Sequence, residues 1–245
     1  MIDCHCHILP GIDDGPETMD QALALCQAMV EDGVRQAYAT PHIHAGRWHN
    51  TPETISRAYD QICTALRKSS IPLELKFAAE VRISDELINW VADGQIPYIG
   101  SDKASDEKLL LLEFPHGHMI PGSINLVRWL VKNGVTPIIA HPERNKELQK
   151  NIGALKEFLA AGAILQLTAA SVIGEFGEGA HRAAEQIIEA NWQAIIASDA
   201  HNLNGRAPRM SAAKHYVTER WGEEKVSQYF YQHQNRWWAA SSLDR

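Results

Sequence analysis

The apolar residues of this chain recur in short runs typical of buried β-strands, and each run is followed by a stretch with helical spacing. Residues 109–112 are wholly aliphatic, as in a strand that is covered on both faces. The predicted strands cover residues 3–7, 36–40, 72–81, 109–112, 135–140, 163–167 and 194–197. The predicted helices cover residues 18–29, 52–66, 85–91, 123–132, 151–161, 180–190, 210–220 and 223–232. Strands that alternate with helices predict an α/β protein with a parallel sheet.

The number of units favours a barrel over an open sheet. Seven strand–helix units within 245 residues leave little room for a second domain, so we expect one domain over 1–245. A polar segment at 94–108 interrupts the pattern without dividing the chain. The sequence contains no glycine-rich dinucleotide or P-loop fingerprint that would support an open, doubly wound sheet. We therefore predict a closed, TIM-like barrel.

Composition and charge exclude several classes of protein. The net charge is −7 and no long Lys/Arg run is present, which argues against a nucleic-acid partner. No stretch of about 18 apolar residues predicts a membrane span, and the polar amino terminus does not resemble a signal peptide. The four cysteines lie at 4, 6, 26 and 63, outside any glycine- and arginine-containing phosphate loop, which argues against a nucleophilic cysteine. A cytoplasmic protein with reduced thiols is expected.

The first strand contains two histidines that are two residues apart. Side chains alternate along a strand, so His5 and His7 are expected on one face, with Cys4 and Cys6 on the other. Two neutral imidazoles on one face can bind one metal ion. The alternative is a chance pair of histidines in a chain that contains 12 of them.

The other strand ends favour the metal interpretation. In parallel barrels, chemistry is carried by the carboxyl ends of the strands and by the loops that follow. Six of the seven predicted strand ends have metal-capable side chains, and the first loop adds two carboxylates: His5, His7, Asp13, Asp14, His42, Glu80, Glu113, His141, Asp199 and His201. Mixed imidazole and carboxylate ligands predict a multinuclear centre of manganese, iron, zinc or cobalt.

Five motifs carry a resemblance to a known family. They are HCHILPGIDDG from His5, Thr40-Pro41-His42, residues 112–115 (LEFP), residues 141–144 (HPER) and residues 198–201 (SDAH). The set is similar to the polymerase and histidinol phosphatase (PHP) superfamily of metal phosphoesterases. More narrowly, it resembles the bacterial capsular-polysaccharide and exopolysaccharide tyrosine phosphatases, from Met1 to about Pro208. The resemblance implies a distorted seven-stranded β/α barrel.

The resemblance also implies a ligand set for three metal ions, usually manganese, with iron, cobalt, zinc or magnesium as alternatives. The first ion would be held by His5, His7, Glu80 and Asp199. Glu80 would bridge to a second ion completed by Glu113 and His141, and Asp14, His42 and His201 would hold the third. Glu113 stands where many members of the superfamily have histidine, which favours the tyrosine-phosphatase branch.

Three further residues are candidates for catalysis. Arg144 and Arg206 follow two of the strand ends, where a guanidinium can bind phosphate oxygens, although both can also be plain surface arginines. Asp13 is a candidate general acid or a support for a metal ligand, and a simple turn role is equally compatible with its loop. Histidines at 44 and 49 are candidates for the substrate cleft or for a solvated loop, and histidines at 116 and 118 for a lid or a phosphate contact. Tryptophans at 221, 237 and 238 are candidates for packing against the barrel or for an oligomer contact.

These residues and the resemblance lead to one predicted function and two alternatives. We expect a metal-dependent protein-tyrosine phosphatase that uses a metal-bridging hydroxide. The family resemblance points to a bacterial tyrosine kinase of capsule or exopolysaccharide synthesis as the phosphoprotein substrate. The alternatives are a phosphoesterase for a small phosphate monoester and a catalytically silent barrel that regulates the kinase. The oligomeric state is left open.

Overall fold

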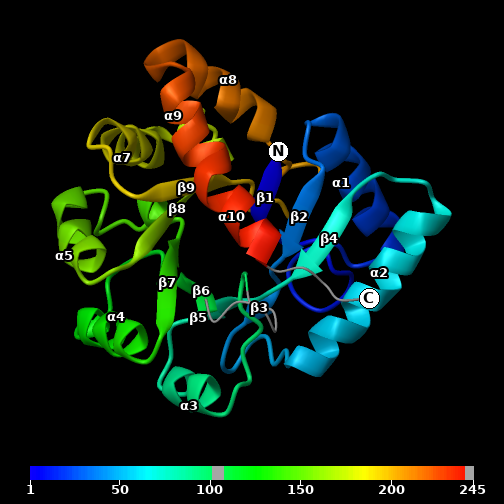
Figure 1. Ribbon diagram of the computed structural model, residues 1–245, viewed down its shortest axis with the longest axis horizontal. Helices are drawn as coiled ribbons and strands as arrows, with labels where there is room; N and C mark the ends of the chain where they lie inside the picture. Colours follow the sequence, from blue (N-terminus) through cyan, green and yellow to red (C-terminus); the bar gives the residue numbers. More distant parts are fainter. Residues whose placement is uncertain (101–107, 241–245) are drawn as a thin grey trace.

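The computed structural model describes residues 1–100 and 108–240, and its strands form two parallel sheets (Figure 1). Residues 101–107 of the predicted polar segment 94–108 lie outside the described residues. The strands are β1 (Ile2–Cys6), β2 (Gln36–Ala39), β3 (His42–Ile43), β4 (Glu74–Phe77), β5 (Glu80–Arg82), β6 (Lys108–Glu113), β7 (Val135–Ala140), β8 (Ile164–Thr168) and β9 (Ala194–Ala197). One sheet has the order β1-β2-β4, and the other has the order β3-β5-β6-β7-β8-β9.

The α/β class and the parallel pairing agree with the prediction, whereas a single closed seven-stranded barrel is not what the strand ladders show. Predicted strand 36–40 corresponds to β2, and the short strand β3, which was not predicted, follows after Thr40-Pro41. Predicted strand 72–81 is divided into β4 and β5 at Ala78-Ala79. Pro41 has no N–H to donate to a neighbouring strand, which interrupts the ladder there. In both places the chain changes sheet, because β2 and β4 belong to one sheet and β3 and β5 belong to the other.

Backbone hydrogen bonds join the two sheets on one side of the interior, and on the other side the chain itself passes from one sheet to the other. At the divided strands, Ala78 N donates to Ala39 O at 2.9 Å, and Glu80 N donates to Pro41 O at 3.1 Å. At the opposite side, His7 N donates to Ala200 O at 2.8 Å, and Asp199 N donates to His5 O at 2.8 Å. The chain beyond β9 therefore lies beside the end of β1, and the strands surround a common interior.

The predicted helices are present in the predicted order. The helices of the structure are α1 (Met19–Glu31), α2 (Pro52–Lys68), α3 (Leu87–Ala92), α4 (Ser123–Lys132), α5 (Leu155–Ala160), α6 (Ala169–Val172), α7 (Glu178–Glu189), α8 (Met210–Trp221), α9 (Glu223–Ser227) and α10 (His233–Ala240). Among them, α6 and α10 are additional helices that the sequence pattern did not predict. Short 3-10 turns cover Pro142–Arg144 and Ile152–Ala154, and a π-helical turn covers Gln228–Gln232. Within the described residues, no helix combines the length and hydrophobicity that a membrane span requires.

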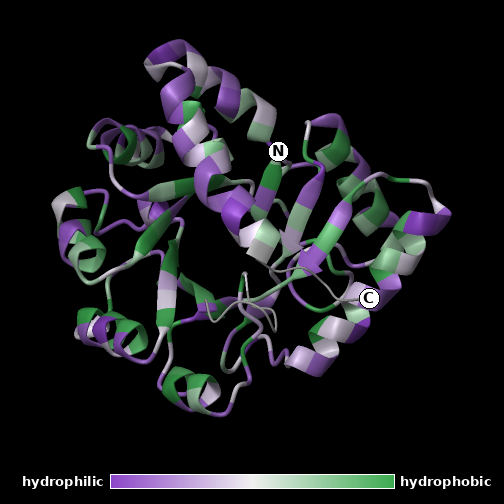
Figure 2. Ribbon diagram, viewed as in Figure 1, coloured by the Kyte–Doolittle hydropathy of each residue, from purple (hydrophilic) through white to green (hydrophobic). Residues whose placement is uncertain are grey.

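The two faces of the strands contribute to different apolar clusters. In β6, Leu110 and Leu112 pack in the larger cluster with residues of the surrounding helices, whereas Leu109 and Leu111 pack in the smaller interior cluster. Most helices lie outside the strands, with their hydrophobic residues turned inward (Figures 1 and 2). Alternation along β6 then brings Glu113, the last residue of the strand, to the interior face. The interior is thus apolar through most of its depth and polar at the carboxyl ends of the strands.

The C-terminal helix packs on the strands at the interior cluster. Trp237 is fully buried in that cluster, and Trp238 packs against it. Tyr38 donates a hydrogen bond to Trp237 O at 3.0 Å, and Nζ of Lys76 donates to Trp238 O at 2.6 Å. Figure 1 shows α10 (red) lying across β1. Trp221 packs at the edge of the larger cluster, so all three tryptophans have packing roles.

One expectation about the first strand is wrong. Cys4 and Cys6 do not share a face, because Cys4 belongs to the interior cluster and Cys6 to the cluster beneath the helices. The pairing of β1 with β2 is irregular between Asp3 and Cys6, which is the signature of a β-bulge. A bulge of this kind changes the direction of the neighbouring side chains, and this one lies just before His7 in the chain.

Candidate metal centre

The residues singled out as ligands come from seven different segments and meet at one end of the interior. They are His5, His7, Asp14, His42, Glu80, Glu113, His141, Asp199 and His201. Three groups of ligand atoms each lie close enough to hold a metal ion: His7 with Asp14, His42 and His201; His5 with His7 and Glu80; and His42 with Glu80 and Glu113.

Glu80 lies at the centre of the cluster. Its Oε2 is 3.3 Å from Nε2 of His5, 3.2 Å from Nε2 of His7 and 3.1 Å from Nδ1 of His42. Its Oε1 is 2.9 Å from Nε2 of His141. One carboxylate therefore contacts four imidazoles, which is the position expected of a bridging ligand.

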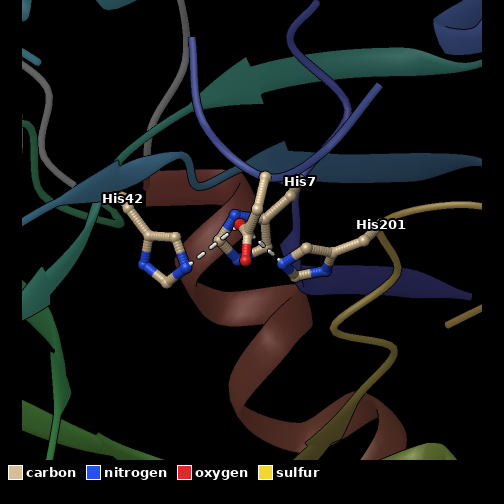
Figure 3. A group of neighbouring side chains, drawn as sticks. His7, His42 and His201 are labelled. Carbon is tan, nitrogen blue, oxygen red and sulfur yellow. Dashed lines mark ion pairs between the residues drawn. The ribbon is translucent and has the colours of Figure 1, made fainter. Parts of the chain in front are cut away.

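Asp14 joins two histidines that come from opposite ends of the sequence. Its Oδ1 lies 3.3 Å from Nε2 of His42 and 3.2 Å from Nε2 of His201. Figure 3 shows His42 and His201 approaching from opposite sides, with His7 between them. The rings of His7 and His201 are stacked with their centroids 3.8 Å apart. This group contains the three predicted ligands of the third ion, together with His7.

Asp199 faces the histidines with one oxygen and the arginines with the other. Its Oδ1 is 3.3 Å from Nε2 of His5 and 3.6 Å from Nε2 of His7. Its Oδ2 accepts hydrogen bonds from Arg144 at 2.5 Å and from Arg206 at 2.6 Å. The two predicted catalytic arginines are therefore held directly against a predicted metal ligand.

Glu113 also divides its two oxygens between different partners. Oε1 forms an ion pair with Arg82 at 2.8 Å, and Oε2 is 3.9 Å from Nδ1 of His42. The predicted second group joined Glu113 to Glu80 and His141, whereas the structure groups His42 with these two carboxylates. His141 nevertheless lies beside this group, since it contacts the other oxygen of Glu80.

Two ligand candidates have left-handed backbone conformations, which are uncommon for residues other than glycine. His141 has φ 33°, and Asp199 has φ 51°. Ile138 and Ala140 face the interior, so strict alternation would direct the next residue toward the helices. The left-handed conformation of His141 instead directs its imidazole to Glu80. Such strain costs about 1–3 kcal/mol and is concentrated at functional sites.

Several buried polar atoms in the cluster make no hydrogen bond within the described residues. They are Nδ1 of His42, Oε2 of Glu80, Oδ1 of Asp199 and Nε2 of His201. Nε2 of His5 also lies only 3.2 Å from Nε2 of His7. Buried polar atoms that lack partners are costly, and carboxylate oxygens and deprotonated imidazole nitrogens carry lone pairs suited to a cation. The donor set therefore fits divalent metal ions.

Without metal, the imidazoles and carboxylates shift each other's proton affinities. Burial opposes the charged form of His5 and His42, but Glu80 and its neighbouring carboxylates raise the pKa of each imidazole to about 9. Burial likewise opposes ionisation of Glu80 and Asp199, but the surrounding cationic groups lower the pKa of both carboxyls well below their usual range. Burial and Arg144 lower the pKa of His141 to about 3. The carboxylates are thus held ionised, ready to bind cations.

Asp13 lies behind His7 and does not line the cavity. Its Oδ2 is 2.7 Å from Nδ1 of His7 and accepts a hydrogen bond from the backbone N–H of His42 at 3.1 Å. Its Oδ1 accepts a hydrogen bond from Gly15 N at 2.9 Å. This geometry directs Nε2 of His7 toward the cluster, as carboxylate partners of metal-binding histidines commonly do.

Gln166 orients His5 in the same way that Asp13 orients His7. This residue was not identified from the sequence. Its Oε1 is 2.8 Å from Nδ1 of His5 and accepts a hydrogen bond from His141 N at 3.2 Å. The available signal was a glutamine in the otherwise apolar predicted strand 163–167, two residues after the interior-facing Ile164. That position faces the same interior as the ligands.

A cavity of about 170 Å³ opens over the cluster. It is lined by Asp14, His42, His44, Arg47, Trp48, Glu80, Arg82, Glu113, His116, His141, Arg144 and Arg206. His44 and His116 are thus at the site, whereas His49 lines a neighbouring pocket instead. Arg47, Trp48 and Arg82 were not anticipated from the sequence.

Comparison with known proteins identifies the family. A family model described as capsular polysaccharide synthesis, CpsB/CapC, matches residues 1–237. The chain is 35% identical over 224 residues to tyrosine-protein phosphatase YwqE of Bacillus subtilis (strain 168), covering 91% of this chain and 86% of the relative. It is 26% identical over 239 residues to tyrosine-protein phosphatase CpsB of Streptococcus pneumoniae, covering 94% and 95% of the two chains.

A solved structure supports the same relationship. It comes from work on YwqE of Bacillus subtilis and CpsB of Streptococcus pneumoniae, described as unique metal-dependent tyrosine phosphatases. It has a TM-score of 0.85 and 34% sequence identity, covering 92% of this chain and 90% of that chain. The resemblance drawn from the sequence motifs is therefore confirmed, and this chain belongs to the CpsB/CapC family.

Proposed function

We propose that this chain is a metal-dependent protein-tyrosine phosphatase. The observation that carries the proposal is Glu80, whose carboxylate contacts four imidazoles in the same cavity that Arg144 and Arg206 line. A phosphate monoester is a dianion, so its hydrolysis requires positive charge and a nucleophile in one place. The relatives named as tyrosine-protein phosphatases supply the substrate class.

The short distances within the cluster support the first and third ligand sets implied by the sequence motifs, and the contact of His141 with Glu80 supports part of the second. In this proposal His5, His7, Glu80 and Asp199 hold one ion, Glu80, Glu113 and His141 hold the second, and Asp14, His42 and His201 hold the third. We propose manganese, with iron, cobalt, zinc and magnesium as alternatives that oxygen and nitrogen ligands also accept. Bound divalent ions supply a nucleophile at neutral pH by lowering the pKa of water and neutralise phosphoryl oxygens.

The protein's own residues bind and orient the phosphoryl group. Arg144 and Arg206 each use one N–H for Oδ2 of Asp199, which leaves further donors of each guanidinium for phosphate oxygens. Those donors are fixed before substrate arrives and so stabilise charge that develops in the transition state. Asp13 and Gln166 orient His7 and His5, and Asp13 acts in this proposal as a support and not as the general acid.

The cavity walls suit an aryl phosphate. His44, Trp48 and His116 line the space beside the cluster, and aromatic walls pack favourably against a phenyl ring. We propose a phosphotyrosine-containing protein as the substrate, and a bacterial tyrosine kinase of capsule or exopolysaccharide synthesis as its source. The family's description, capsular polysaccharide synthesis, supports that pathway. Action on a kinase places the enzyme in the cytoplasm in this proposal.

The fold we propose is one PHP-type domain over 1–245. Joining β2 with β3 and β4 with β5 reduces the strands to seven, as in a distorted β/α barrel. The hydrogen bonds between the end of β1 and the segment after β9 support such an arrangement.

The test measures phosphatase activity on a phosphotyrosine peptide after chelation and again after manganese is restored. We expect turnover that returns with manganese, that resists thiol alkylation and that is nearly abolished by His141→Ala. His215→Ala is a matched control, because this exposed histidine on α8 pairs with Glu219 away from the cavity. Activity on small phosphate esters alone would reject the protein substrate, and metal binding without any turnover would favour a regulatory barrel.

A further inference from the structure

Four arginines line the cavity, and three of them are paired with carboxylates. Arg144 and Arg206 contact Asp199, and Arg82 contacts Glu113. Arg47 has no carboxylate within ion-pairing distance among residues 1–100 and 108–240. The positive charge of Arg47 is therefore not balanced locally by the described part of the chain.

The backbone around Arg47 forms a closed turn. His44 N donates to Trp48 O at 2.9 Å, Trp48 N donates to His44 O at 2.9 Å, and Arg47 N donates to His44 O at 3.0 Å. Gly46 has φ +78°, a left-handed conformation that glycine adopts without strain. The guanidinium of Arg47 lies 5.3 Å from the centre of the Trp48 ring. A cation–π contact and a hydrogen-bonded turn thus limit the positions that this charge can take.

Arg47 lies nearer to solvent than the other three arginines. It is an exposed residue, whereas the side chains of Arg144, Arg206 and Arg82 are 16%, 26% and 20% exposed. Glu80, Glu113 and His141 at the bottom of the cavity are almost fully buried, so the phosphoryl group belongs there. Arg47 is therefore at the mouth, where the polypeptide on either side of a bound phosphotyrosine must pass.

We propose that Arg47 forms an anion-binding subsite at the cavity mouth that favours substrates with an acidic side chain next to the phosphotyrosine. This inference rests on the proposed function and adds a selection step to it. Arg82, Arg144 and Arg206 already face carboxylates, so among the described residues Arg47 is the cation of the cavity lining that an acidic side chain beside the phosphotyrosine can meet. A rim charge acts chiefly on the rate of productive encounter and on the preference between substrates.

The experiment is an internal competition between two phosphotyrosine peptides in one reaction with the manganese-loaded enzyme. One peptide has glutamates on both sides of the phosphotyrosine, and the other has glutamines of the same shape. The ratio of product formation gives the ratio of kcat/KM values directly. We expect a preference of about three- to fivefold for the glutamate peptide at low ionic strength, decreasing as salt is added.

Variants of Arg47 decide whether the preference comes from this residue. Arg47→Ala is expected to reduce the ratio to about one, and Arg47→Lys, which retains the charge, to preserve part of it. Arg57→Ala is the matched control, because this exposed arginine on α2 lies outside the cavity lining, and its ratio should equal that of the wild type. A ratio near one in the wild type, or a ratio that Arg47→Ala leaves unchanged, would overturn the proposal.

Failure of the subsite and failure of the proposed function give different results. If the wild type cleaves both peptides equally, the phosphatase activity stands and the subsite is rejected. If it cleaves neither, the function is rejected, and the subsite is judged from binding. Non-hydrolysable phosphonate versions of the two peptides then report the preference by fluorescence anisotropy, with the same ratio expected to depend on Arg47.

Discussion

Arg144 and Arg206 reach the same oxygen of one carboxylate from two separate loops. Both donate to Oδ2 of Asp199, at 2.5 and 2.6 Å, while Oδ1 of Asp199 remains directed at His5 and His7. One buried residue therefore positions the groups proposed to bind phosphate relative to the groups proposed to bind metal. Phosphate binding and metal binding can therefore be tested separately, because each arginine can be removed while the inward-facing oxygen of Asp199 stays in place.

Replacing either arginine should reduce catalysis without removing metal. We expect Arg144→Ala and Arg206→Ala each to lower kcat by about 100- to 1,000-fold, the effect of losing one fixed donor to developing charge. Metal content measured by elemental analysis should stay at the wild-type level. Arg128→Ala is the control, because Arg128 pairs with Glu157 on an exposed surface. Wild-type kcat in either cavity variant would contradict the assignment.

Asp13→Asn should distinguish support of His7 from general-acid catalysis. If Asp13 orients His7, metal affinity should fall by about 10- to 100-fold, the usual effect of losing such a partner. The activity that remains at saturating metal should then show the wild-type dependence on the pKa of the leaving group. A loss confined to substrates with poor leaving groups would instead identify Asp13 as the acid. Asp20→Asn, on the exposed face of α1, controls for the change of charge.

Gln166→Leu should weaken metal binding through His5. The substitution removes the acceptor 2.8 Å from Nδ1 of His5 but keeps a side chain of similar volume. We expect a 10- to 100-fold higher dissociation constant for manganese by calorimetry, and recovery of much of the affinity in Gln166→Glu, which retains an acceptor oxygen. Gln27→Leu on exposed α1 serves as the control. Unchanged affinity in Gln166→Leu would remove the proposed orienting role.

Metal binding should release protons. The imidazoles of His5 and His42 have their pKa values raised to about 9 in the metal-free protein, so both are charged at neutral pH. Only neutral imidazole binds metal, so filling the site must displace about two protons. Affinity is therefore expected to rise with pH up to about 9 and to fall as acid returns the protons. Calorimetry in buffers of different ionisation enthalpy measures the release, and a binding enthalpy independent of buffer would refute it.

Trp237→Ala should destabilise the fold. Trp237 is fully buried in the interior cluster, and removal of so large a side chain leaves a cavity that costs about 3–5 kcal/mol. Denaturant titration should show that loss in the free energy of unfolding. Ile88→Ala is the control, because Ile88 is 45% exposed and should change stability by less than about 1 kcal/mol. Equal stability of the two variants would show that α10 is dispensable.

The pattern of apolar residues predicted most helices and strands well, but it did not predict where strands are interrupted. The strands over 135–140 and 194–197 and the helix over 123–132 have the predicted bounds, because apolar periodicity and flanking turn residues both mark them. The division at Ala78-Ala79 was not visible in the sequence, because Phe77, Ala78 and Ala79 are all apolar. It arises because Ala78 bonds to one neighbouring strand and Ala79 N bonds to Pro97 O instead. The bulge that separates Cys4 from Cys6 likewise depends on pairing with β2.

The order of residues was sufficient to place imidazoles and carboxylates at successive strand ends and to reveal the family, because both are read from spacing along the chain. It could not show that Glu80 is the carboxylate on which four histidines converge, or that Asp199 holds Arg144 and Arg206. Those relationships join residues as much as 75 positions apart along the chain, as for His5 and Glu80. Gln166 and Arg47 were missed for the same reason, since a glutamine in a strand or an arginine in a loop acquires a role only from the neighbours that folding brings to it.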